Sequence, residues 1–197
     1  MLLAMPVMAE MDATSTDIYA AQSSSLDGSA IDPNPVRDGS AFTQYDTVFF
    51  AGAMAESYYD SRGIDFEQES GAGHLISLNR SSSASVICPY FSYDSKQGGI
   101  QPRVRYLAFE YATQASIDFN DETEIYGFII NNGGTNPGRR ILFDPPLKSK
   151  FMTMKVIHLG AWYRFDRGLS MTLLIRNPST QYYGMVSIGG YGARFEW

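Results

Sequence analysis

The sequence predicts a mainly β protein: an antiparallel β-sandwich, compatible with a jelly-roll connection, preceded by an extended N-terminal arm. Aromatic residues make up 14% of the 197 residues, and the chain contains 18 glycines. This composition favours strands and turns over helices. Short apolar or alternating runs recur along the chain, separated by turn-forming residues. We therefore expect two parts, with residues 1–41 forming the arm and residues 42–197 forming the sandwich body.

The first 36 residues have a composition that cannot build a packed core by itself. They contain no Lys or Arg and are rich in Ala, Ser, Asp, Met and Pro. A short helix is expected over residues 17–22. Because ordering a backbone costs about 1 to 2 kcal/mol per residue, an ordered arm needs contacts with another surface, and a neighbouring subunit is the expected source. The predicted partner-binding anchors are the apolar residues Met1, Leu2, Leu3, Met5, Val7 and Met8.

The body is expected to consist of short strands. The clearest alternation, over residues 103–111, places Leu107 and Phe109 on one face of a strand and Tyr106 and Ala108 on the other. Residues 162–175 have the pattern of a hairpin, residues 54–59 have helical character, and Gly189-Gly190 is predicted to be a turn. The expected strands cover residues 47–51, 74–78, 85–93, 103–113, 115–119, 124–131, 139–143, 151–165, 169–176, 182–188 and 193–197.

Charge is distributed unevenly along the chain, whose net charge is −6. Residues 1–102 contain 13 acidic and 4 basic residues, and residues 103–197 contain 8 acidic and 11 basic residues. Opposite charges on the two halves would favour specific pairing between copies, and solvated faces that happen to differ in charge are the alternative explanation. An arm without basic residues argues against direct contact with nucleic acid and against a polybasic membrane anchor. No stretch is long and apolar enough to span a bilayer, and no signal peptide is expected.

Few residues are available for nucleophilic or metal chemistry. The histidines are His74 and His158, and Cys88 is the single cysteine, which lies in an apolar run typical of core. A zinc site needs four converging ligands, which these spacings do not provide. Nucleophilic catalysis needs a Ser or Cys beside a base, and no catalytic motif is present. No cofactor is expected.

Two acidic segments have calcium-like features. Asp118, Asn120 and Glu122 repeat the first oxygen ligands of a calcium loop, but position six of that pattern is Thr123 and position twelve is Ile129. A hairpin turn with solvated carboxylates and a weak calcium site are both compatible with this pattern. A second acidic loop is expected at Asp60, Asp65, Glu67 and Glu69.

Three functional hypotheses follow from the sequence. The main one is a non-enzymatic structural subunit of a virion, in a capsid, decoration or tail-associated role. Its arm would pack on copies of itself and on other subunits of the same particle. The alternative is a carbohydrate- or receptor-binding β-sandwich module, in which exposed aromatics such as Trp162 and Trp197 stack on sugars. The third, a glycosidase or lyase that uses loop carboxylates, has no recognisable catalytic arrangement.

Overall fold

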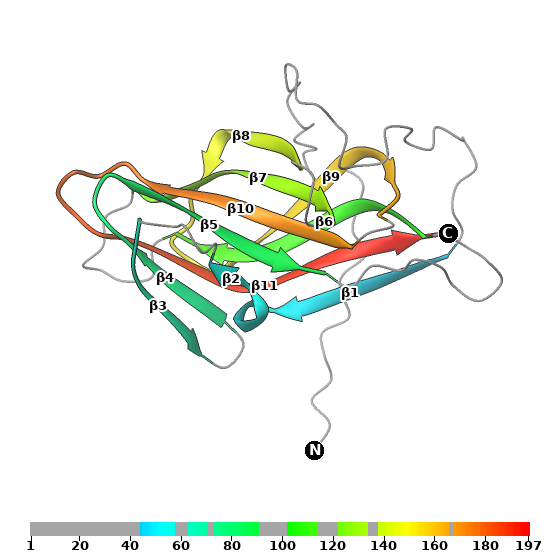
Figure 1. The fold of residues 1–197 in the computed structure, drawn as a ribbon, viewed down its shortest axis with the longest axis horizontal. Coiled ribbons are helices and arrows are strands. Elements are labelled where there is room, and N and C mark those ends of the chain that lie inside the picture. The colour runs from blue at the N-terminus through cyan, green and yellow to red at the C-terminus, as the bar shows by residue number, and fades with distance from the viewer. Residues whose placement is uncertain are drawn as a thin grey trace.

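The computed structural model describes residues 44–57, 63–70, 73–90, 102–113, 122–133, 138–165 and 168–197. These residues form two antiparallel sheets packed face to face (Figure 1). The six-stranded sheet contains β1 (Tyr45–Ala51), β3 (Ile64–Ser70), β4 (Gly73–Leu78), β6 (Arg103–Ala112), β9 (Thr153–Tyr163) and β11 (Gly184–Glu196). The five-stranded sheet contains β2 (Glu56–Ser57), β5 (Ser82–Pro89), β7 (Glu124–Asn132), β8 (Arg139–Leu147) and β10 (Leu169–Asn177).

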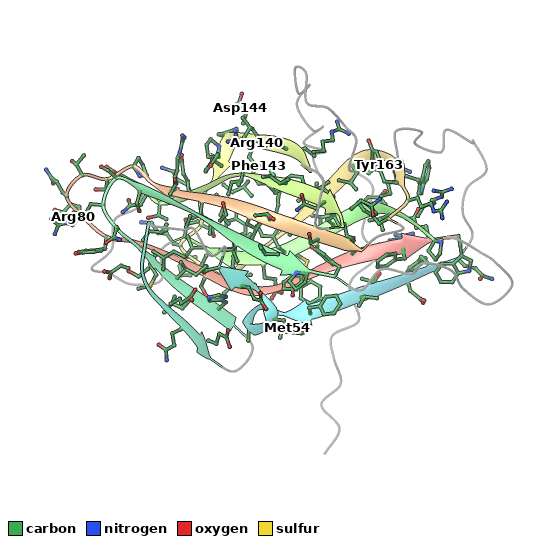
Figure 2. The ribbon with its side chains drawn as sticks, in the orientation of Figure 1. Met54, Arg80, Arg140, Phe143, Asp144 and Tyr163 are labelled. Atoms are coloured by element: carbon green, nitrogen blue, oxygen red, sulfur yellow. The ribbon has the colours of Figure 1, made fainter. Side chains whose placement is uncertain are left out.

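The core lies between the two sheets and is built from alternate residues of each strand. Phe109 of β6 and Phe128 of β7 have no exposed surface, and both pack near Phe143 of β8, with ring centroids 6.4 and 5.4 Å from it. Figure 2 shows side chains filling the space between the sheets, with Phe143 labelled among them. This interior holds the two sheets at a fixed separation, so their outer faces form rigid surfaces.

β11 organises the six-stranded sheet because it pairs with three strands. Along one side it pairs with β6, whereas on the other side its first half pairs with β4 and its second half with β1. The change of partner coincides with a register irregularity between Ile188 and Gly190. The short η1 helix (Gly52–Met54) then carries the chain from β1 towards β2 in the other sheet. As a result, β1 lies beside the glycine-rich second half of β11.

The fold class expected from the sequence is confirmed: the described chain is a mainly β, two-sheet antiparallel sandwich. Three local predictions are wrong. Gly189-Gly190 is not a turn but lies inside β11. The expected hairpin is absent from the described sheets, since β9 pairs with β6 in one sheet whereas β10 pairs with β5 and β7 in the other. Residues 54–59 were expected to be helical, but the helix ends at Met54 and β2 begins at Glu56.

Several predictions fall outside the described residues. They are the N-terminal arm and its boundary at residue 41, the helix at residues 17–22 and the strand at residues 115–119. The partner-binding anchors also lie there: Met1, Leu2, Leu3, Met5, Val7 and Met8. Contacts with other copies, and the expected lack of contact with nucleic acid, stay predictions. No helix in the described ranges has the length and apolar character needed to cross a membrane.

Candidate functional site: an aromatic face on the six-stranded sheet

The outer surface of the six-stranded sheet carries a concentration of aromatic and charged side chains. In β1, Val48 and Phe50 pack into the core, so strand alternation turns Tyr45, Thr47 and Phe49 outwards. The same alternation applies to the paired parts of β11, β6 and β9. We call this surface the aromatic face and define it by Tyr45, Phe49, Arg105, Tyr106, His158, Trp162, Arg194 and Glu196.

Phe49 lies on β1, the strand at one border of the aromatic face, directly opposite Gly192 in the β1–β11 pairing. A Cβ atom added at Gly192 would lie 2.5 Å from Phe49 Cδ2, and one added at Gly190 would lie 2.4 Å from Phe49 Cε1. The ring therefore covers both glycines and rests against the backbone of β11. Its exposed fraction is still 41%, so one aromatic surface remains available to a ligand.

A shallow, open depression lies beside the Phe49 ring. Small residues form its floor, because Gly192 of β11 is paired with Ala108 of β6. Taller side chains rise around this floor, which makes the surface concave at one point. The residues that line the depression include Thr47, Phe49, Tyr106, Ala108, Gly192 and Arg194.

A nearly buried carboxylate fixes the polar groups at one end of the face. The Glu196 side chain is 7% exposed, and its Oε2 accepts a hydrogen bond from Trp162 Nε1. Its Oε1 lies 2.9 Å from Arg194 Nε. The Arg194 guanidinium in turn lies 4.0 Å from the ring centroid of Tyr45 and 5.5 Å from that of Tyr106. These contacts hold Arg194 in one orientation, which lowers the entropy lost when a ligand binds it.

A second arginine is held nearby by different contacts. The Arg105 guanidinium lies 4.2 Å from the ring centroid of Trp162 and 5.6 Å from that of Tyr106. Its Nε donates a hydrogen bond to Nε2 of His158, whose ring stacks on Tyr106 at a centroid distance of 4.9 Å. In this hydrogen bond His158 Nε2 is the acceptor. Arg105 is thus oriented by two aromatic rings and one imidazole.

The two tryptophans proposed from the sequence have different surroundings. Trp162 lies in the aromatic face, where it contacts Arg105 and Glu196. Trp197 follows β11 next to the start of β1, and its Nε1 donates a 2.7 Å hydrogen bond to Gln44 Oε1. The structure therefore brings Trp162 into contact with charged residues of the face and places Trp197 beside Gln44.

The histidines and the cysteine do not converge. His158 lies on the opposite face of β9 from the buried Ile157 and Leu159. His74 is 2% exposed, with Nδ1 at 2.8 Å from the carbonyl oxygen of Ala55. Cys88 is fully buried, and burial raises the pKa of its thiol. In the ranges that the structure describes, no three His, Cys, Asp or Glu residues are grouped to hold a metal ion.

The structure describes only part of the two acidic segments, and one of them differs from the expectation. Asp65, Glu67 and Glu69 belong to β3, so the predicted acidic loop is wrong there. Asp60 lies outside the described residues. For the calcium-like pattern, Asp118 and Asn120 also lie outside them, whereas Glu122 is described in a turn before β7. The weak calcium site stays untested.

Sequence reasoning missed most of the aromatic face, including Tyr45, Phe49, Arg105 and Arg194. One signal was present: Gly190 and Gly192 alternate in β11, and the ring of Phe49 from β1 covers both of them. Aromatic rings covering strand glycines are a known packing device. The pairing of these distant segments was needed to recognise it.

Comparisons with known proteins identify no family but do give structural similarities. No protein-family model matches the chain, and no curated protein matches it. A mutant of a family 29 carbohydrate-binding module is similar at 10% identity and a TM-score of 0.42, covering 77% of this chain and 92% of that chain. A family 61 module in complex with β-1,4-galactotriose has 10% identity and a TM-score of 0.40, with coverages of 79% and 90%.

A carbohydrate esterase of family two from Cellvibrio japonicus is also similar, at 12% identity and a TM-score of 0.37. The match covers 78% of this chain but 35% of the esterase chain. At these identities and TM-scores the similarity does not assign a function to this chain.

These comparisons correct the main functional expectation, which was a capsid, decoration or tail-associated protein located in a virion. The similar structures are carbohydrate-binding modules and an esterase, not virion proteins. The virion hypothesis rested on contacts made by the N-terminal arm, and that arm lies outside the described residues.

Proposed function

We propose that this chain is a non-catalytic carbohydrate-binding module whose aromatic face binds a polysaccharide. Sugars present apolar C–H surfaces on the ring faces and hydroxyl groups around the ring edges. A binding surface therefore needs exposed aromatic rings together with fixed hydrogen-bonding groups. The aromatic face provides both on one rigid sheet.

The observation that carries this proposal is the position of Phe49. Its ring rests on Gly190 and Gly192 and yet is 41% exposed. An aromatic residue whose inner side is supported by backbone and whose outer side is open is suited to stacking against a sugar ring. The adjoining depression and the fixed Arg194 place hydrogen-bond donors next to this surface.

The surroundings of Cys88 and Glu196 are the reason for proposing a non-catalytic module. The thiol of Cys88 is buried away from the aromatic face and its pKa is raised. The Glu196 carboxylate is engaged by Arg194 and by Trp162, so it serves to position these side chains. A glycosidase would need two carboxylates flanking one sugar bond. The contacts of Glu196 therefore favour binding over hydrolysis.

The test is a screen of soluble polysaccharides by affinity gel electrophoresis, followed by calorimetry on each polysaccharide that retards the protein. The Tyr45→Ala variant should lose affinity, because it removes an exposed ring and the support of Arg194. Tyr182→Ala is the matched control. Tyr182 is 54% exposed against 59% for Tyr45, but it precedes β11 in the chain and is not part of the aromatic face.

The comparison of these two variants decides the proposal. Equal losses in both variants would show that binding does not use the aromatic face. A screen in which no polysaccharide retards the wild-type protein would refute the proposed function. Release of reducing sugar during incubation would refute its non-catalytic part.

A further inference from the structure

The charge balance of the aromatic face points to the class of polysaccharide. Glu196 lies beside Arg194, so these two charges offset each other. Arg105 instead contacts His158, Tyr106 and Trp162. Among the described residues, no carboxylate forms an ion pair with it. Within the part of the chain that the structure describes, Arg105 is therefore a partly buried cation without an ion-pair partner.

The orientation of Arg105 leaves a defined part of the guanidinium available. Its Nε is engaged by His158 and one side of its plane is covered by Trp162. The two Nη groups are not used in these contacts. Together they form the fork that binds a carboxylate or a sulfate with two parallel hydrogen bonds. Arg105 is thus positioned to receive an anionic group.

We propose that the ligand is an acidic polysaccharide and that Arg105 binds its carboxylate or sulfate groups. This inference rests on the proposed carbohydrate-binding function and names the class of ligand. The site is continuous, because Tyr106 both contacts Arg105 and lines the depression beside Phe49. One polysaccharide molecule could therefore place a sugar ring on Phe49 and an acidic group on Arg105.

The other charges of the protein confine the expected binding of an acidic group to the surroundings of Arg105. The chain has a net charge of −6, which disfavours general attraction to polyanions. Glu110, the acidic residue of β6, lies five positions further along the strand from Arg105, roughly 15 Å away at the usual rise per residue. We therefore expect an acidic group to be accepted at the Arg105 end of the face.

The experiment compares polysaccharides that differ in charge. Polygalacturonate and its methyl ester share one backbone, as do dextran sulfate and dextran, so each pair isolates the anionic group. Calorimetry on the full chain should give tighter binding to at least one charged member than to its neutral partner. Raising the salt concentration should reduce that preference, because the Arg105 contact is partly exposed. The two pairs distinguish carboxylate from sulfate.

The variant is Arg105→Gln, and Arg140→Gln is its matched control. Arg140 lies on β8 of the opposite sheet, where its guanidinium is 5.7 Å from the ring centroid of Tyr126. Figure 2 shows Arg140 on the far side of the sandwich from Met54, which ends the short helix that follows β1. Both variants change the net charge equally. Arg105→Gln should weaken binding to the preferred anionic polysaccharide about tenfold or more, whereas Arg140→Gln should leave it unchanged. Arg105→Lys keeps the positive charge and should lose less.

The outcomes separate this inference from the proposed function. Equal binding of charged and neutral members, with loss in Tyr45→Ala, would overturn the inference and keep the proposed function. Equal loss in the Arg105 and Arg140 variants would also overturn it, because the effect would then be one of net charge. Failure of every polysaccharide to bind would overturn both. Thermal denaturation of each variant identifies any loss that is due to unfolding.

Discussion

Replacing Phe49 with alanine should weaken polysaccharide binding about 30-fold. The ring is 41% exposed in the unbound protein. A phenylalanine presents about 200 Å² of surface, so a stacked sugar could cover about 80 Å² of it. At about 25 cal/mol per Å², covering that surface contributes about 2 kcal/mol, which corresponds to about a 30-fold change in the dissociation constant.

Isothermal titration with the polysaccharide found in the screen measures this change directly. Phe49→Tyr keeps the ring and should bind within a few-fold of wild type. Leu142→Ala removes a 48% exposed apolar side chain from β8 of the opposite sheet and should not affect binding. The reasoning would be refuted if Phe49→Ala bound like wild type, or if Leu142→Ala lost as much affinity. Melting curves would show whether each variant is folded at the titration temperature.

Two further predictions concern the same sandwich. Gly192→Ala places a Cβ atom 2.5 Å from Phe49 Cδ2 and 2.7 Å from the Val48 carbonyl oxygen, so the ring must move. The free energy of unfolding should therefore fall by about 1 to 3 kcal/mol, and the affinity for the polysaccharide should fall as well. Unchanged values in denaturation and titration would contradict this prediction. Cys88 should not react with an aromatic disulfide reagent at pH 8 in the folded protein, because burial raises the pKa of its thiol and excludes the reagent. It should react once the protein is unfolded in denaturant. Rapid labelling of the folded protein would contradict this prediction, because it would show that the thiol is accessible.

The sequence was sufficient to predict the class of the fold and many of its strands. Alternation at residues 103–111 correctly separated the buried Leu107 and Phe109 from the outward Tyr106. A period-two pattern indicates which side chains of a strand share a face, but it does not indicate which sheet the strand joins. For this reason β9 and β10 were predicted to pair, although Phe165 and Leu169, which flank their connection, are both buried and the strands lie in different sheets.

The candidate site was less accessible from sequence because it depends on pairing between distant segments. Gly189-Gly190 has the composition of a turn. In the fold, Gly190 and Gly192 instead receive the ring of Phe49, which comes from the first strand of the structure. β3 was missed for a related reason: its segment IDFEQES is largely polar and lies at a sheet edge, where little apolar alternation is required.

Mapping the ligand on the protein by NMR tests the account most directly. Titration of the isotope-labelled chain with an oligosaccharide of the preferred polysaccharide should shift amide and side-chain signals of Phe49, Arg105 and Arg194, on the outer side of the six-stranded sheet. Signals from β5 and β8 in the other sheet should stay unchanged. Shifts confined to the five-stranded sheet, or to residues outside the aromatic face, would contradict the claim that this face binds the carbohydrate.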